Sequence, residues 1–189
     1  QSCKETTHLG FVTSGQDALE RHAWRLTAAP VKIGALQRYA VDHLMAQAGD
    51  HPFTRAPDTG RRLAVVGAGP AGLSFAHRAS MLGHSVTVFE AKPKPGGLNE
   101  YGLAAYKMVN DFARREVEFL LGIGGIDIEY GVALGADITL DRLRREFDAV
   151  FIGAGLVRPA ALGVPGETLG GVRDALDFIE KVRQTEDKS

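Results

Sequence analysis

The chain has 189 residues, of which 44% are hydrophobic and 24% are charged. This composition supplies enough apolar residues for one sizeable core and excludes a disordered or fibrous chain. The 22 Lys and Arg residues nearly balance the 23 Asp and Glu residues, so charge indicates neither a nucleic acid nor an anionic membrane as partner. No apolar run has the roughly 20 residues of a membrane span. The single cysteine, Cys3, excludes an internal disulfide framework, and we expect a cytoplasmic protein.

Residues 1–60 are predicted to form a small α-helical segment followed by a linker. The ranges Gln16–Ala28 and Lys32–Gln47 have helical patterns, and Pro30 separates them because proline cannot continue the first helix. Apolar residues at helical spacing give the second helix one apolar face. The range Ala48–Gly60 is rich in turn-forming residues, which predicts a linker.

From residue 61 onwards, strand and helix patterns alternate. Short apolar runs predict strands at Leu63–Val66, Ser85–Glu90, Ile126–Tyr130 and Ala149–Ile152. Helices are predicted at Ala71–Leu82, around an apolar stripe from Val109 to Leu121, and at Leu140–Phe147 with Thr139 as its cap. The alternation predicts an α/β domain over residues 61–189, with a Rossmann-like, doubly wound parallel sheet.

The stretch from Val65 to Glu90 carries the strongest functional signal. Gly67, Gly69 and Gly72 form a G-x-G-x-x-G pattern directly after a strand and at the start of a helix. In this pattern the glycines allow a tight turn, close backbone approach to a pyrophosphate and close packing of helix on strand. The positive end of the helix attracts the diphosphate. Glu90 ends the next strand, where a carboxylate accepts ribose hydroxyls and repels a 2′-phosphate.

Two later segments leave alternatives open. The range Lys92–Lys107 contains a proline-broken loop and the pair Gly96-Gly97, whose backbone can lie against a cofactor or can simply form a surface loop. The pattern Gly153-Ala154-Gly155 follows the last strand and by itself favours an ordinary strand-terminating turn over a cofactor contact. The six histidines lack the spacing of a metal site, so we expect no metal ligands. We also expect no catalytic acid, base or nucleophile.

Read together, the residues GAGPAGLSFAHRASMLGHSVTVFEAKPKPGGLNEYGLAAYK, from Gly67 to Lys107, resemble the FAD-binding domain of pyridine nucleotide-disulphide oxidoreductase-like flavoproteins. The narrower resemblance is to the glutamate synthase small subunit and to the flavin part of dihydropyrimidine dehydrogenases. The segment GGLNEYGLAAYK has Ala104 where the glutamate synthase branch usually has proline, and it therefore resembles bacterial NAD-dependent dihydropyrimidine dehydrogenase small subunits more than that branch. The resemblance continues through GGIDIEYG, FDAVFIGAGL and LGVPGETLGGVRDALDFI. PVKIGALQRYAVD resembles the helix that joins the family's iron–sulfur region to its flavin domain.

The resemblance implies a set of FAD contacts. Around the diphosphate it places Gly67, Ala68, Gly69, Pro70, Ala71 and Gly72. It implies that Glu90 and Ala91 reach the adenosine ribose, and that Gly97 and Leu98 approach the diphosphate and the ribityl chain. The second FAD-contacting turn matches Gly153, Ala154 and Gly155.

The implied function is that of the FAD-binding part of an NAD(P)H-dependent oxidoreductase. Electrons would pass from NAD(P)H through FAD to iron–sulfur clusters or to a larger partner subunit. Family members carry clustered cysteines upstream and an NAD(P)H-binding domain downstream, whereas this chain has only Cys3 and one glycine fingerprint. We therefore expect part of a longer flavoprotein, inactive alone, with an FAD domain incomplete at its C-terminus and the other two cofactors bound outside this chain. The alternative is a stand-alone NAD-binding module or sensor.

Overall fold

A computed structural model describes residues 31–47, 51–156 and 160–185. The predicted helix Gln16–Ala28 and the free thiol of Cys3 lie outside these described residues. Contacts divide the chain into two separate units, Gln1–Asp50 and His51–Ser189.

The first unit contains helix α2 (Ile33–Ala46), which confirms the helix predicted there. Arg38 and Asp42 form an ion pair in which Nε and Oδ2 are 2.8 Å apart. The rings of Tyr39 and His43 stack with their centroids 6.3 Å apart. Residues four apart face each other along a helix, so both contacts stabilise α2 locally.

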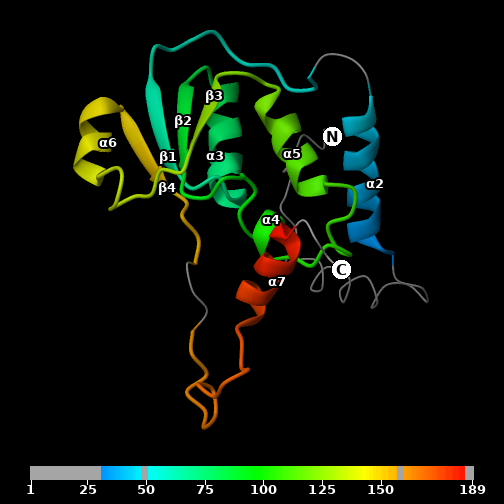
Figure 1. The fold of residues 1–189 in the computed structure, drawn as a ribbon. Helices are drawn as coiled ribbons and strands as arrows, with labels where there is room; N and C mark the ends of the chain where they lie inside the picture. Colours follow the sequence, from blue (N-terminus) through cyan, green and yellow to red (C-terminus); the bar gives the residue numbers. More distant parts are fainter. Residues whose placement is uncertain (1–30, 48–50, 157–159, 186–189) are drawn as a thin grey trace. The chain divides into compact units, whose positions relative to one another are not determined.

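The second unit is built on a four-stranded sheet (Figure 1). Its strands are β1 (Arg62–Val66), β2 (Ser85–Glu90), β3 (Ile126–Tyr130) and β4 (Ala149–Ile152). They lie in the order β3-β2-β1-β4, and every neighbouring pair is parallel. All four predicted strands and the parallel, doubly wound sheet are therefore confirmed.

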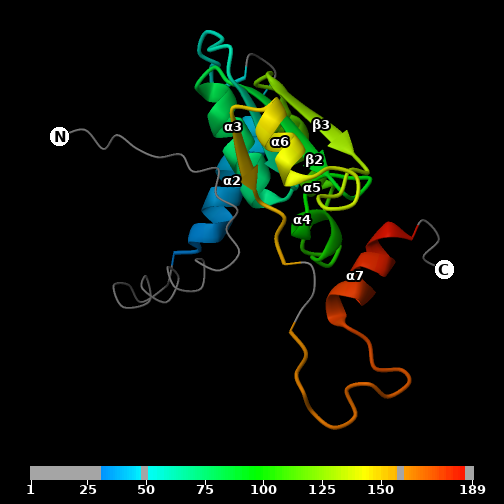
Figure 2. The same cartoon turned by 90° about the vertical axis from the view of Figure 1, so that its left-hand side faces the viewer.

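Helices cover both faces of this sheet. Helices α3 (Pro70–Met81) and α5 (Phe112–Leu121) lie on one face, and α6 (Leu140–Glu146) lies on the other (Figures 1 and 2). The side-chain oxygen of Thr139 accepts a hydrogen bond from the Arg142 amide at 3.2 Å, which confirms the predicted cap of α6. Among the described helices, none is long and apolar enough to cross a membrane.

Residues of β1 alternate between two apolar cores. Val65 is fully buried and lies against Gly72 of α3. The core on the opposite face, under α6, contains Ala64, Val66, Phe89, Ile138 and Leu143. Because both faces are covered, β1 needs apolar residues at consecutive positions rather than at every second one.

The strand order reverses beside β1. Strands β2 and β3 lie on one side of β1 and β4 lies on the other, so the chain crosses the sheet between β3 and β4. In doubly wound sheets, ligands bind outside the carboxyl ends of the strands at such a reversal. Here these ends lead into residues 67–69 and 153–155.

Helix α5 begins later than the apolar stripe predicts. Asn110 and Asp111 have φ angles of 57° and 51°, a left-handed backbone that does not continue a right-handed helix. Val109 therefore precedes α5 and is 46% exposed, whereas Phe112 and Val117 are buried. The prediction of Val109 as a helical core residue is wrong for this reason.

Two described helices are absent from the predicted elements: α4 (Leu98–Tyr101) and α7 (Ala175–Gln184). A signal for α7 is present in the sequence. The carboxylate of Asp174 accepts hydrogen bonds from the amides of Leu176 and Asp177 at 2.8 and 3.3 Å, as an N-cap residue does. No comparable signal marks α4, which is a single turn.

Residues 51–60 form a strap along the α/β unit. The amide of Ala56 donates to the carbonyl of Met81 at 3.0 Å. The guanidinium of Arg55 donates to the carbonyl of Gly83 at 3.3 Å, just beyond the end of α3. A cation at this position interacts favourably with the negative end of the helix. The strap belongs to the second unit and is hydrogen-bonded to its α/β part, while the domain boundary at residue 60 stays a prediction.

Candidate cofactor site

Three glycine-containing turns meet at the carboxyl ends of β1, β2 and β4. They comprise residues 67–69, 96–97 and 153–155, and together they form the three-turn site. The amide of Gly96 donates to the carbonyl of Ala68 at 2.8 Å and joins the second turn to the first. The first amide of the third turn donates to the carbonyl of Val66 at 2.8 Å. The structure therefore brings together three segments that are far apart in the sequence.

Gly67 and Gly72 make this assembly possible because neither position has room for a side chain. Gly67 has a φ angle of 96°, and a Cβ there would lie 2.6 Å from the carbonyl oxygen of Gly153. A Cβ on Gly72 would overlap the carbonyl oxygen of Gly67. The first and third glycines of the fingerprint thus allow β1, α3 and β4 to approach one another closely.

Gly69 and Gly97 lie where the first and second turns touch. Gly97 has a φ angle of 51°, and a Cβ there would lie 2.7 Å from the Cα of Gly69. A Cβ on Gly69 would meet nothing closer than 3.8 Å, which is ordinary van der Waals contact. Packing within the described structure therefore leaves space for a side chain at Gly69, so the absence of one is consistent with close approach of a ligand.

Helix α3 begins at the three-turn site. Gly69 is its N-cap residue, Pro70 occupies the first turn, and no side chain of the described residues caps the helix. Proline is favourable there because it has no amide hydrogen that would need a partner. The uncapped amides and the positive end of the helix dipole are together suited to bind an anion such as a diphosphate.

Glu90 is held beside the first turn. Its side chain is only 8% exposed, and its two carboxylate oxygens accept hydrogen bonds from the amides of Ala68 and Lys92 at 2.7 and 2.8 Å. These bonds fix the carboxylate at the carboxyl end of β2. A carboxylate has about four lone-pair sites, so it can accept two further hydrogen bonds from a ligand.

The residues predicted to contact FAD differ in how exposed they are. Ala68 is fully buried, whereas Gly67, Gly69, Pro70, Gly97 and Gly153 are half-buried. The exposed ones are Ala71, Ala91, Leu98, Ala154 and Gly155. The structure thus places all the predicted positions on or beside the three turns, while their contacts with FAD stay a prediction.

Tyr101 fixes the loop before the second turn. Its hydroxyl accepts a hydrogen bond from the Lys94 amide at 3.0 Å, and its ring is 6% exposed. Burial raises the pKa of Tyr101, and the nearby carboxylates of Glu100, Glu90 and Glu180 also favour its neutral form. The side chain therefore stays protonated and orders the loop.

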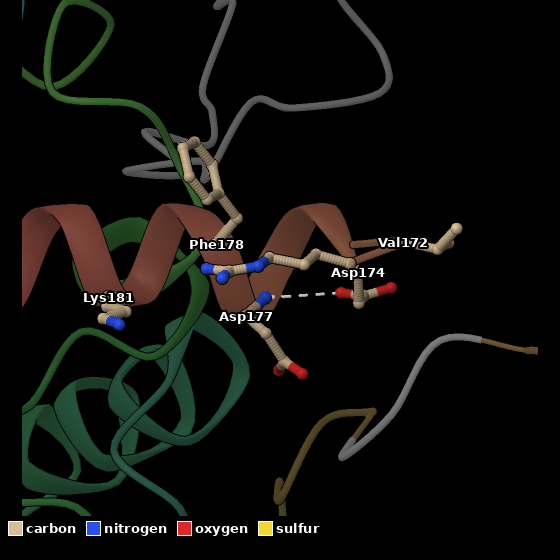
Figure 3. Close-up of a pocket in the computed structure, with 6 residues that line it drawn as sticks. Val172, Asp174, Asp177, Phe178 and Lys181 are labelled. Atoms are coloured by element: carbon tan, nitrogen blue, oxygen red, sulfur yellow. Dashed lines mark hydrogen bonds between the residues drawn. The ribbon is translucent and has the colours of Figure 1, made fainter. Parts of the chain in front are cut away.

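A shallow pocket elsewhere in the unit is unrelated to the three turns (Figure 3). It is lined by Val172, Arg173, Asp174, Asp177, Phe178 and Lys181. All six residues belong to one continuous segment that leads into α7 and follows it, and the Asp174 carboxylate caps the helix (Figure 3). This pocket follows the surface of a single helix and brings no distant groups together.

The second turn is shaped by one residue that the sequence indicates and by one that it does not. Gly96 belongs to the glycine pair singled out in the sequence; it has a φ angle of 111° and provides the hydrogen bond to the first turn. Lys92 is the residue that sequence reasoning missed. The ammonium of Lys92 lies 4.1 Å from the ring centroid of Tyr101. No spacing in the sequence indicates that contact, because it depends on how the loop folds back.

The parallel sheet, the glycine turn at the strand reversal and the buried acid at the end of β2 define a dinucleotide-binding domain of the Rossmann type. The family model described as pyridine nucleotide-disulphide oxidoreductase matches residues 61–189. The chain belongs to this family of oxidoreductases, as the sequence resemblance predicted.

Several curated proteins are similar to this chain. The putative oxidoreductase AegA of Escherichia coli is 36% identical over 149 residues, which cover 79% of this chain and 22% of AegA. The NADP(+)-dependent formate dehydrogenase subunit beta of Moorella thermoacetica is 40% identical, and the match covers 66% of this chain and 17% of that subunit. The glutamate synthase [NADPH] small chain of Bacillus subtilis is 36% identical, and the match covers 79% of this chain and 30% of that small chain. The chain thus spans less than a third of the length of these relatives.

The fold also matches solved structures. The chain resembles FprA, an oxidoreductase of Mycobacterium tuberculosis solved in complex with NADPH, with a TM-score of 0.56 and 25% sequence identity. The match covers 66% of this chain and 28% of FprA. The predicted similarity to the glutamate synthase small subunit is confirmed, while the closer similarity to dihydropyrimidine dehydrogenase stays a prediction.

Proposed function

We propose that this chain is the FAD-binding part of an NAD(P)H-dependent oxidoreductase. One observation carries the proposal: three glycine turns and the buried carboxylate of Glu90 converge where the strand order reverses. The family match and the names of the oxidoreductase relatives support it. When bound, FAD supplies the redox chemistry by accepting a hydride and releasing electrons singly.

The residues of the site provide binding and orientation. The turn 67–69 and the amides at the start of α3 would hold the diphosphate. Glu90, already fixed by two amides, would accept hydrogen bonds from the adenosine ribose, with Ala91 beside it. Gly97 and Leu98 would lie along the diphosphate and ribityl chain, and the turn 153–155 would contact the cofactor from β4.

The position of the second turn favours FAD over NAD alone. The turn lies directly against Gly69, so the site extends beyond a single strand–helix–strand unit and offers a second backbone surface to an extended ligand. A simple NAD-binding module needs only the first turn and the acid after the second strand. The stand-alone NAD-binding module therefore remains the second candidate.

The proposal for the whole protein is broader than this chain. We infer that electrons pass from NAD(P)H through FAD to iron–sulfur clusters or to a larger partner subunit in the cytoplasm. Support comes from relatives whose names include a formate dehydrogenase subunit and a glutamate synthase small chain. The iron–sulfur clusters and the NAD(P)H site would lie outside these 189 residues.

A ligand titration tests the cofactor assignment. The purified chain is titrated with FAD, FMN and NAD⁺ while the visible flavin spectrum, flavin fluorescence and thermal midpoint are recorded. We expect FAD to bind most tightly, because only FAD joins a flavin to the adenosine diphosphate that the turns are suited to hold. A protein that binds no flavin but is stabilised by NAD⁺ would support the second candidate instead.

Gly69→Val is the variant that locates the site. Its backbone φ is not positive and packing leaves space for a Cβ, so we expect it to fold but to block the approach of the diphosphate. Gly170→Val is the matched control, because nothing lies within 4 Å of a Cβ at Gly170. Unchanged FAD affinity in Gly69→Val would contradict the site assignment.

A further inference from the structure

Helix α7 returns to the loop that carries the second glycine turn. The helix comes after β4 in the chain, yet it contacts α4 (Figure 1). No residue of α7 is fully buried, so the contact is not a conventional apolar helix interface. Hydrogen bonds and ion pairs join α7 to this loop.

Arg183 makes the most enclosed of these contacts. Its guanidinium donates to the carbonyl of Leu103 at 3.0 Å and to the carboxylate of Glu100 at 3.4 Å. The side chains of Arg183 and Glu100 are only 10% and 15% exposed. The amide of Gln184 donates to the other oxygen of Glu100 at 3.0 Å. Both carboxylate oxygens of Glu100 are therefore held by α7.

A second group of contacts holds the loop before the turn. The ammonium of Lys92 lies 2.6 Å from the carboxylate of Glu180 on α7, and it also lies over the ring of Tyr101. The ammonium of Lys94 donates to the side-chain oxygen of Gln184 at 2.8 Å. These pairs are more exposed than the Arg183 pair, and solvent screens them more strongly.

The residues held by α7 are bonded directly to the second turn. The amides of Glu100 and Tyr101 donate to the carbonyl of Gly97 at 3.1 and 2.9 Å. Besides these bonds within α4, the second glycine turn is fixed by the hydrogen bond from the amide of Gly96 to the carbonyl of Ala68. A shift of Glu100 would therefore move Gly97 relative to Gly69.

We propose that α7 acts as a clamp on the second glycine turn, with Arg183 as a positioning residue for the cofactor. The clamp comprises Glu180, Arg183 and Gln184. Removing Arg183 leaves the carboxylate of Glu100, which is 15% exposed, with the more exposed ammonium of Lys94, 3.8 Å away, as its remaining cationic partner. Breaking the enclosed pair in this way is costly. The cofactor part of this proposal rests on the proposed function, whereas the effect on the turn does not.

The first test measures the turn without any cofactor. Amide hydrogen exchange is compared between the wild-type chain and Arg183→Met. We expect exchange at Gly96 and at residues 99–103 to accelerate about tenfold or more, with β1 unchanged, because local opening becomes easier. Arg114→Met is the matched control, since it removes an exposed ion pair with Glu118 on α5. Equal exchange in the two variants over residues 96–103 would overturn the clamp.

The second test separates positioning from general stability. The dissociation constants of FAD and of ADP are measured for the wild type and for Arg183→Met. We expect FAD to bind about tenfold more weakly, which corresponds to about 1.4 kcal/mol, because the proposed function puts the second turn on the flavin side of the diphosphate. ADP, bound by the first turn and Glu90, should be affected less. An equal loss for both ligands would show a structural effect only and would overturn the positioning role.

Two further variants keep the proposal testable if Arg183→Met does not fold. Glu180→Gln breaks the more exposed pair with Lys92 and should show the same pattern of exchange with a smaller increase. The double variant Glu100→Gln with Arg183→Met should lower the free energy of unfolding by less than the sum of the two single changes, because the two residues share one interaction. If the wild type binds no FAD, the proposed function fails while the exchange experiment still decides the clamp.

Discussion

Gly67 and Gly69 are two residues apart in the first turn and lack a side chain for different reasons. At Gly67 the positive φ angle and the carbonyl of Gly153 both exclude a Cβ. At Gly69 the protein leaves space for one, so only a ligand would be hindered. The fold therefore requires glycine at position 67, whereas at position 69 only ligand binding would require it.

The two glycines therefore predict different effects of alanine. Gly67→Ala should lower the free energy of unfolding by roughly 1–3 kcal/mol, the cost of a residue forced into an unfavourable backbone region. Gly69→Ala should change it by less than about 0.5 kcal/mol, as an uncrowded substitution does. Urea unfolding of both variants measures this. Equal destabilisation by the two changes would contradict the packing described for this turn.

His77 makes the stability of the α/β unit depend on pH. Burial, followed by the neighbouring His51, holds its pKa below the ordinary value of 6.5, and its Nε2 has no hydrogen-bond partner among the described residues. The unfolded chain then binds more protons than the folded chain. Stability from this group is complete above about pH 6.5 and is lost as the pH falls toward the folded pKa.

Replacing His77 tests this dependence. We expect His77→Phe to flatten the fall in unfolding free energy below pH 6.5, because phenylalanine fills a similar volume and does not titrate. Urea unfolding at a series of pH values measures the slope. The control is His43→Gln, which lies in the other unit of the chain. The hypothesis fails if the slope is the same in wild type and His77→Phe.

At the scale of elements, helix ends explain where the predictions were accurate. Thr139, the predicted cap, is the N-cap residue of α6, which begins immediately afterwards. Asp174 has the same role for α7, a helix that was not predicted. In contrast, Asn110 and Asp111 interrupt a helical pattern that periodicity alone would continue. Apolar spacing therefore located α2 and α5 but not α7, while backbone conformation at single polar residues decided the helix ends.

The contribution of the α6 cap to stability can be measured by mutation. Thr139→Ala removes the acceptor of the Arg142 amide and should cost about 1 kcal/mol of unfolding free energy. Thr168→Ala, at an exposed position, is the matched control. Chemical denaturation compares the two variants. A Thr139→Ala midpoint equal to that of the control would mean that the cap does not stabilise α6.

At the scale of the whole α/β unit, most of the fold could be predicted from the sequence because parallel strands leave a strong local signal. Each of the four strands is a short run whose type does not depend on distant contacts, and the fingerprint from Gly67 to Gly72 fixes one strand–helix junction. The candidate site was predictable as a set of turns.

Other features could not be predicted because they depend on tertiary contacts. The single-turn helix α4 is held by Arg183 and Gln184, which come about 80 residues later and show no pattern in common with it. The touching of Gly69 and Gly97 similarly depends on how two loops fold toward each other. Family resemblance implied that both turns approach the diphosphate of FAD, whereas the contact between them is seen only in the structure.

The strap of residues 51–60 gives the molecule a useful point of attachment. It is bonded near Gly83, at the amino ends of the parallel strands, whereas the three turns lie at their carboxyl ends. The five residues of β1 separate the two edges by about 17 Å. A spectroscopic label or surface tether at the exposed Asp58 would therefore leave the cofactor end of the sheet free, and binding could be followed on an immobilised chain.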